Sequence, residues 1–204
     1  CHNPDTWDID GRAETKTPEE IIAVLNRFKP YYGTDGGVTF SGGEPLLQKE
    51  FLTETLALCK SHGIHTCLDT AGVGTGSYEE ILKHTDLVLF DMKHYTREGY
   101  FNITGQPIDE SLRFLHAVQK LNIPVWIRHV VVPGLTDSRE HLLGLFESVK
   151  EVKNVKKVEL LPYHVLGVPK YKAMGIPYRL EHVPPQNAAE LEQWQNMMNE
   201  YFQK

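Results

Sequence analysis

The stretch SGGEP at residues 41–45 has the clearest chemical potential, and it directly follows the β-favouring residues 38–40. Gly42 and Gly43 carry no Cβ atoms, so their backbone N–H and C=O groups can face a ligand at close range. Glu44 adds a carboxylate at the same point. The pattern is equally compatible with a tight structural turn between a strand and a helix, because glycine turns are common. The stretch therefore predicts either a ligand cradle or a turn.

Alternating strands and helices must position this turn. Apolar patterns predict strands over 38–41, 64–69, 87–91, 125–132 and 157–161. A capping box that begins at Thr17 predicts the first helix. Further helices are expected at residues 48–62, near 78–83, starting at 109 or 110, at 138–149 and at 188–202. The helix from 109 or 110 is expected to use Leu112, Phe114, Leu115, Val118 and Leu121 as its apolar face. Residues 1–16 and 163–187 are predicted to be irregular.

This alternation predicts an α/β fold with a parallel sheet and right-handed crossovers. The sheet is expected to be either open and doubly wound or a barrel-like arc. The sequence has neither a GxGxxG nor a GxxxxGK[ST] motif, which disfavours the nucleotide-binding open sheets. No internal boundary stands out, so residues 1–204 are expected to form a single domain.

Composition narrows the function classes. The 204 residues carry a formal net charge of −6 and no basic cluster, which argues against a nucleic-acid surface. No run of 18 apolar residues and no signal-like segment occurs, so we expect no membrane span and a cytoplasmic location. The three cysteines follow no disulfide-framework spacing, and Cys59 and Cys67 are expected to be buried thiols. Because the sequence begins at Cys1 without an initiator Met, we expect that an upstream part is missing.

Every predicted strand delivers polar side chains to its carboxyl end, where parallel α/β folds bind ligands. These are Glu44, then Asp69 and Thr70, then Asp91, Met92 and Lys93, then Arg128 and His129, and then Tyr163 and His164. Five strands with this property are hard to assign to helix capping alone. Arg128 lies among apolar residues and needs an anion, which is either a ligand or a structural ion pair with Asp91 or Asp69.

This set of groups suits a small zwitterion. Glu44 and the carbonyls of the glycine turn could hold an ammonium group, and Lys93 could hold a carboxylate. Asp91 could accept hydrogen bonds from ribose hydroxyls, and His164 could lie near a base. Asp69 and Asp91 could instead share a cation, since hard oxygen ligands suit one.

Several segments resemble a known family. Cys1-His2-Asn3 is similar to the end of the CxxxCxxC motif of radical S-adenosylmethionine (SAM) enzymes, and residues 41–45 resemble their GGEP motif. Four further segments are similar to the family of pyruvate formate-lyase activating enzymes, namely residues 65–70, 91–93, 125–128 and 160–164. The resemblance extends over essentially the whole chain.

The resemblance implies a partial (β/α)6 barrel with a 4Fe–4S cluster whose open iron site binds SAM. Reductive cleavage of SAM would yield a 5′-deoxyadenosyl radical, which removes a hydrogen atom from the Cα of a glycine in pyruvate formate-lyase. A flavodoxin or ferredoxin would donate the electron, and a monomer is expected.

The resemblance also implies roles for individual residues. Catalytic roles fall to Cys1, Lys93 and Arg128, with Cys1 as a cluster ligand and Arg128 orienting the glycine loop of the partner. Asp69 and Asp91 would flank a monovalent cation. Cofactor contacts are implied for His2, Gly42, Gly43, Glu44, Asp69, Thr70, Asp91, Met92, Lys93 and His164.

One feature departs from the family, because only the third cysteine of the motif is present. A chain with one thiolate cannot hold a cluster that needs three. We therefore expect the full-length protein to be the activating enzyme, and the 204 residues alone to be inactive, without the first strand and the cluster loop.

Three alternatives remain open. The chain could belong to an activating enzyme of another glycyl radical enzyme, although many of these insert a cysteine-rich module that is absent between Cys1 and Ser41. It could catalyse a different radical SAM reaction. It could also be a cofactor-free βα module that binds an anion through Lys93 and Arg128, or that binds a protein.

Overall fold

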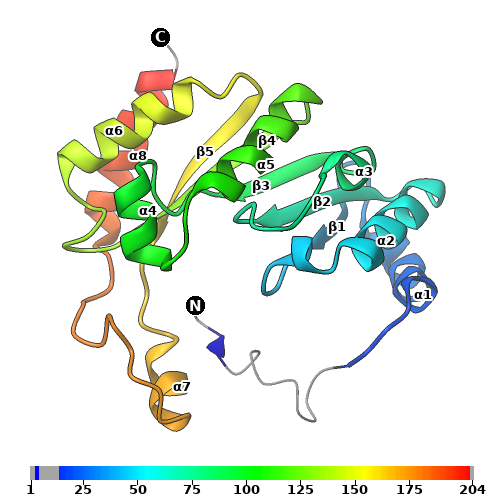
Figure 1. Cartoon of the computed structure of the whole chain (residues 1–204), viewed down its shortest axis with the longest axis horizontal. Helices are drawn as coiled ribbons and strands as arrows, with labels where there is room; N and C mark the ends of the chain where they lie inside the picture. Colours follow the sequence, from blue (N-terminus) through cyan, green and yellow to red (C-terminus); the bar gives the residue numbers. More distant parts are fainter. Residues whose placement is uncertain (1–2, 5–13, 203–204) are drawn as a thin grey trace. The chain divides into compact units, whose positions relative to one another are not determined.

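Five strands carry the predicted site residues, and they form one sheet in the order β1-β2-β3-β4-β5 (Figure 1). The computed structural model describes residues 3–4 and 14–202. The strands are β1 (Gly37–Phe40), β2 (His65–Thr70), β3 (Leu87–Asp91), β4 (Val125–Val131) and β5 (Val155–Pro162). The pairs β1–β2, β2–β3 and β3–β4 are parallel. The predicted α/β class is therefore confirmed, and the order leaves β1 and β5 at the edges of an unclosed sheet.

Helices connect successive strands, as the right-handed crossovers of a parallel sheet require. The connecting helices are α2 (Lys49–Ser61), α3 (Glu79–Leu82), α4 (Arg97–Thr104), α5 (Asp109–Lys120) and α6 (Arg139–Lys150), with the short 3-10 turn η3 (Pro45–Leu47) before α2. Helix α1 (Pro18–Phe28) and the 3-10 turn η2 (Lys29–Tyr31) precede β1, and α7 (Val168–Ala173) and α8 (Ala188–Phe202) follow β5. No helix among the described residues is long and apolar enough to span a membrane.

The predicted start of α1 is confirmed in detail. Thr17 accepts a hydrogen bond from the backbone N–H of Glu20, whose carboxylate accepts one from the N–H of Thr17 at 2.8 Å. Pro18 occupies the first helical turn, where its missing N–H costs nothing. Local sequence was sufficient for this element because all the partners lie within four residues.

The strand register separates two faces of the sheet. Side chains alternate along a strand, so residues that are paired across strands share a face. One face presents the buried residues Leu68, Val88 and Val125, followed by Thr70, Phe90 and Ile127. The other face presents Asp69, Leu89 and Trp126, followed by Asp91 and Arg128. The charged residues therefore lie on one face, opposite the apolar layer.

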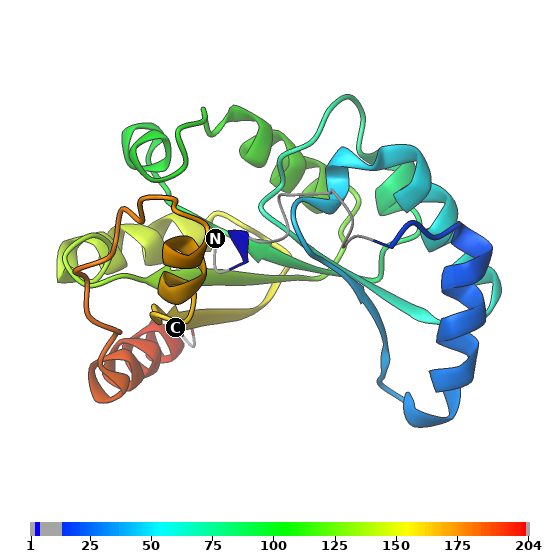
Figure 2. The same cartoon turned by 90° about the horizontal axis from the view of Figure 1, so that it is seen from below.

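The chain packs as two compact units. The larger unit comprises residues 16–128 and 148–158, and the Phe114 ring of α5 stacks on Phe90 of β3 at 6.2 Å between centroids. The other unit comprises residues 129–147, 159–202 and the described part of 1–15; there Phe146 of α6 packs against Tyr201 of α8 at 5.6 Å. Figure 2 shows the same elements from below. The single domain over 1–204 stays a prediction.

The structure corrects some details of the sequence-based prediction. Leu112 and Leu121 do not belong to the buried face of α5, since they are 43% and 39% exposed. Helix α4 was not predicted at all, and α7 lies inside the segment 163–187 that was expected to be irregular. Most of the predicted loop 1–16 lies outside the described residues.

Candidate active site at the strand ends

The glycine turn after β1 is open on its exposed side. Gly42 has a φ of 120°, a backbone conformation that residues other than glycine rarely adopt. A Cβ atom built on Gly42 or Gly43 would meet no described protein atom within 4 Å. The described protein therefore gives no packing reason for Gly43, and the backbone here can be approached closely by another molecule.

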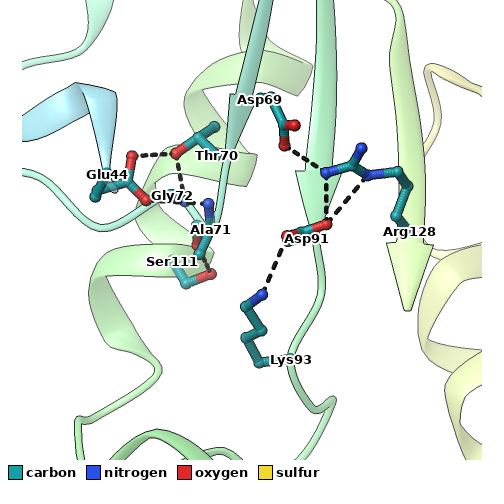
Figure 3. Close-up of polar contacts among 9 residues, drawn as sticks. All are labelled: Glu44, Asp69, Thr70, Ala71, Gly72, Asp91, Lys93, Ser111 and Arg128. Carbon is teal, nitrogen blue, oxygen red and sulfur yellow. Dashed lines mark hydrogen bonds and ion pairs between the residues drawn. The ribbon is translucent and has the colours of Figure 1, made fainter. Parts of the chain in front are cut away.

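Glu44 also serves the structural role that was considered as an alternative. It precedes η3 and accepts a hydrogen bond from the N–H of Leu46 at 3.2 Å. Its Oε1 accepts from the hydroxyl of Thr70 at 2.5 Å, and its Oε2 from the N–H of Ala71 at 3.0 Å (Figure 3). Burial raises the pKa of Glu44, while the hydrogen bonds from Thr70, Leu46 and Ala71 act in the opposite direction. The carboxylate is thus held in a fixed orientation at the end of β1.

Thr70 supports Glu44 as part of a small polar network. Its hydroxyl also accepts a hydrogen bond from the N–H of Gly72 at 2.8 Å. Ser111 of α5 donates to the carbonyl oxygen of Ala71 at 2.6 Å, which ties the turn after β2 to this helix (Figure 3). The sequence did not indicate Ser111, because its role depends on a contact with a residue 40 positions away.

A second network lies on the charged face of the sheet. Arg128 donates from Nε and Nη2 to Oδ1 of Asp91 at 3.1 and 2.9 Å, and from Nη2 to Oδ1 of Asp69. Lys93 donates to Oδ2 of Asp91 at 3.0 Å (Figure 3). The Arg128 side chain is 18% exposed and each aspartate is 23% exposed. The structural ion pair considered for Arg128 is therefore present, and it involves both aspartates.

The electrostatics of this network are finely balanced. Burial raises the pKa of Asp69, the nearby charge of Arg128 lowers it, and the negative charge of Asp91 raises it again. Two carboxylates this close together need a cation between them, and the guanidinium supplies it. Among the described residues, no group of three or more His, Cys, Asp or Glu side chains could hold a metal ion.

The remaining predicted site residues lie elsewhere. Met92 follows β3 with a side chain that is 6% exposed, and its N–H donates to the carbonyl oxygen of Arg128 at 2.9 Å. His164 follows β5, belongs to the other compact unit and is half-buried with a buried Nδ1. Cys1 and His2 lie outside the described residues.

The cysteines of the described chain do not suit cluster ligation. Cys59 lies in α2 and is fully buried, and burial raises its pKa to about 11. Cys67 lies in β2 at 6% exposure, and burial raises its pKa as well. Cluster ligands are thiolates, whereas these two groups are held as thiols. Of the three cysteines only Cys1 is a candidate ligand, so these 204 residues do not supply the three thiolates that a 4Fe–4S cluster needs.

Comparison with known proteins places these features in a family. Residues 1–146 match the radical SAM superfamily. A pyruvate formate-lyase-activating enzyme of Clostridium pasteurianum is 55% identical over 184 residues, which cover 90% of this chain and 77% of that protein. The chain belongs to this family of radical SAM proteins. An activating enzyme of the same name from Staphylococcus epidermidis is 45% identical over 91% of this chain and 77% of its own length.

Solved structures agree on the fold. A domain of a pyruvate-formate lyase-activating enzyme from Bacteroides vulgatus superposes with a TM-score of 0.65 and 23% identity, covering 81% of this chain and 94% of that one. The unclosed parallel sheet is thus the partial barrel of radical SAM proteins, as the resemblance implied. Membership of the superfamily implies a 4Fe–4S cluster and SAM as cofactors. The open glycine turn and the fixed carboxylate of Glu44 fit SAM, while the cysteines of these 204 residues do not fit the cluster.

Proposed function

We propose that the protein acts in the activation of pyruvate formate-lyase, by generating a radical on a glycine of that enzyme. The observation that carries the proposal is the 55% identity to an activating enzyme over 90% of this chain, together with the open turn and Glu44 at the end of β1. When bound, the cluster and SAM supply a carbon-centred radical that can take a hydrogen atom from a glycine Cα.

Side chains of this chain would hold SAM by its charged groups. The Glu44 carboxylate, which the hydroxyl of Thr70 and the N–H of Ala71 orient, would accept from the ammonium group together with the Gly42–Gly43 backbone. Lys93 is 37% exposed and can exchange its bond with Asp91 for one with the carboxylate. Asp91 would then accept from the ribose, while Thr70 holds Glu44 in place. Cys1 as a cluster ligand, and His2, Met92 and His164 as SAM contacts, are proposed on the family motifs alone.

Arg128, Asp69 and Asp91 would act on the side of the site that receives the glycine loop of the partner enzyme. A monovalent cation that binds between Asp69 and Asp91 would take the position of the guanidinium and release it. Freed from these carboxylates, Arg128 could orient the glycine loop of pyruvate formate-lyase. We propose the cation on the ground that two carboxylates converge where a positive charge is required.

The decisive experiment uses the full-length gene product, loaded with iron and sulfide without oxygen. Incubation with pyruvate formate-lyase, SAM and a reductant should produce a glycyl radical signal in electron paramagnetic resonance. A Cys1→Ser protein should produce none, because it lacks a cluster ligand. If the unsubstituted protein binds SAM and a cluster but gives no glycyl signal, the proposal is wrong.

We propose further that the 204 residues alone hold no complete cluster and are inactive. Burial raises the pKa of Cys59 and of Cys67 and keeps both as thiols, so of the three cysteines Cys1 alone remains as a candidate ligand. Reconstitution of this chain with iron and sulfide, followed by iron counting, should give far fewer than four iron atoms per chain. A stoichiometric 4Fe–4S cluster would contradict this.

An activating enzyme for a different glycyl radical enzyme is the second candidate. The stretch from residue 2 to residue 58 contains no cysteine, which disfavours the branches that insert a cysteine-rich module. The glycyl radical assay separates the two candidates when it is run with each partner enzyme in turn. We also propose a flavodoxin or ferredoxin as electron donor, a monomer, and a cytoplasmic site, where an oxygen-sensitive cluster survives.

A further inference from the structure

A series of hydrogen bonds connects Ser111 on α5 to the carboxylate of Glu44. The Ser111 hydroxyl donates to the carbonyl oxygen of Ala71 at 2.6 Å. The same peptide unit ends in the N–H of Gly72, which donates to the hydroxyl oxygen of Thr70 at 2.8 Å. That hydroxyl donates in turn to Oε1 of Glu44 at 2.5 Å (Figure 3). The three bonds therefore form one hydrogen-bond relay, in which every donor points towards Glu44.

The relay is shielded from water along most of its length. Ser111 and Thr70 are each only 3% exposed, and both belong to the larger compact unit. Glu44 at the end of the relay is half-buried, and it directly follows the exposed residues Gly42 and Gly43. Hydrogen bonds inside a protein are stronger than in water, and linked bonds polarise one another. The buried part can therefore influence the one group that lies near the open turn.

Apolar packing holds the central peptide of the relay against α5. A Cβ on Gly72 would lie 3.0 Å from a ring atom of Phe90 and 3.1 Å from one of Phe114. The Phe114 ring stacks on Phe90 and meets the edge of Tyr78 with 5.1 Å between centroids. Ser111 and Phe114 lie one turn apart on the same helix. Helix α5 therefore contacts this turn twice, by a hydroxyl and by a ring.

A second buried hydroxyl approaches the relay from α4. Tyr100 is 2% exposed. Burial raises the pKa of Tyr100, hydrogen bonding with Ser111 lowers it, and the negative charge of Glu44 raises it. Because its pKa is raised, Tyr100 remains a neutral phenol near pH 7 and places no charge beside the carboxylate. The pKa of Glu44 itself is raised by burial and lowered by its hydrogen bonds, including that from Thr70.

We propose that Ser111 is a positioning residue for SAM binding, which orients the Glu44 carboxylate through the Ala71–Gly72 peptide and the Thr70 hydroxyl. The inference rests on the proposed function for its purpose, because there Glu44 accepts from the ammonium group of SAM, but the relay itself does not.

The direction of the effect follows from the order of the donors. A hydroxyl that donates to the Ala71 carbonyl polarises the peptide, so the N–H of Gly72 becomes a better donor. Because the oxygen of Thr70 accepts from this N–H, its own hydrogen is directed to Glu44 rather than rotating freely. A stronger donor to a carboxylate favours its charged form. Ser111 thus helps to keep Glu44 ionised and fixed in orientation.

A carbon-13 NMR titration of the Glu44 carboxyl in this chain tests the relay. In Ser111→Ala the pKa of Glu44 should rise, since the bond from Thr70 is weakened. The rise should be smaller than in Thr70→Val, which removes the donor itself. Ser111→Thr keeps the hydroxyl and should return the titration to that of the unsubstituted chain. An unchanged titration in Ser111→Ala would overturn the inference.

Thr85→Val is the matched control for the loss of a buried hydroxyl. Thr85 is 7% exposed and donates to the carbonyl oxygen of Ile81 at 3.0 Å, just before the amino end of β3 and so away from the relay. This variant should leave the Glu44 titration unchanged. Amide exchange at Gly72 should be about two- to tenfold faster in Ser111→Ala, as expected for one lost hydrogen bond, and unchanged in Thr85→Val. Equal effects of these two variants would indicate general loosening and overturn the inference.

A third measurement tests the purpose of the relay. In the full-length protein, Ser111→Ala should raise the dissociation constant for SAM about two- to tenfold, the cost of one weakened hydrogen bond. Ser111→Thr should restore the affinity, and Thr85→Val should not change it. Unchanged affinity in Ser111→Ala would overturn the positioning role. A missing glycyl signal in the unsubstituted protein would instead count against the proposed function, and the Glu44 titration would still decide the relay.

Discussion

Asp91 and Arg128 are directly paired in the register of β3 and β4, and two nitrogens of the guanidinium converge on one carboxylate oxygen, at 2.9 and 3.1 Å. The same guanidinium reaches Asp69 on β2, so one side chain links three neighbouring strands at their carboxyl ends. Lys93 occupies the other oxygen of Asp91. In this state the charges of the site neutralise one another, and a ligand must exchange these partners rather than fill an empty space.

Removal of the Arg128 charge should destabilise the larger unit. Arg128→Met leaves two partly buried aspartates without their shared partner, and we expect the free energy of unfolding to fall by about 2 to 3 kcal/mol. Arg97→Met is the control, since Arg97 pairs with Asp109 on the surface with side chains 70% and 58% exposed. Urea unfolding should show a clear shift of the midpoint for Arg128→Met and almost none for Arg97→Met. Equal shifts would contradict the structural role of the network.

The carboxyl of Glu44 should make stability depend on pH in a defined direction. Burial raises its pKa in the folded state above the ordinary value of 4.5. Such a group contributes its full stabilisation below its unfolded pKa, and the contribution is lost as the pH rises through the folded pKa. Relative to Glu44→Gln, the unsubstituted chain should therefore lose stability as the pH rises from 4.5 through the raised folded pKa of Glu44.

Thr70 provides an independent check on that pH dependence. Its hydrogen bond lowers the pKa of Glu44, so Thr70→Val should raise the folded pKa further and move the loss of stability to higher pH. Unfolding curves measured at several pH values for the three proteins are sufficient. A pH dependence that is the same with Gln at position 44 would show that Glu44 is not its source.

Alanine substitutions at Gly72 and Gly105 should distinguish the cost of backbone strain from the cost of overpacking. Gly72 and Gly105 have φ values of 77° and 72°, so alanine at either position costs about 1 kcal/mol in backbone conformation. A Cβ on Gly72 would also lie 3.0 Å from Phe90 and 3.1 Å from Phe114, whereas one on Gly105 meets no described atom within 4 Å. Gly72→Ala should therefore be the more destabilising by about 1 to 3 kcal/mol. Similar unfolding energies for the two variants would rule out the crowding at Gly72.

Larger side chains at Gly43, in the open turn, should weaken SAM binding without changing the stability of the fold. A Cβ on Gly43 meets no described protein atom within 4 Å, so Gly43→Ala and Gly43→Val should change the free energy of unfolding by less than about 0.5 kcal/mol. In the full-length protein with its cluster, SAM affinity should fall with size, with the valine variant weaker than the alanine variant. Titration calorimetry measures both constants. Unchanged affinity in the valine variant would show that no ligand approaches this backbone.

Local sequence patterns were sufficient to predict most helices and strands, and to predict that polar side chains lie at the carboxyl ends of the strands. They failed for α4, whose signals are weak because Gly99 and several polar residues interrupt its apolar face, although Thr96 and Gly105 do cap it. They failed for α7, which is only six residues long and lies among prolines. Leu112 and Leu121 have helical spacing yet are exposed, because the width of a buried face depends on what packs against it.

The sequence by itself determined the parallel α/β fold, the position of the glycine turn and the family, because caps, breakers, strand periodicity and motifs are all local signals. Only the tertiary structure decided which charges meet. Glu44 binds Thr70 and Ala71, which lie 26 and 27 positions away, while Asp69, immediately before Thr70, binds Arg128 on the opposite face. Such partners follow from strand register, in which a shift of one residue exchanges the two faces of a strand.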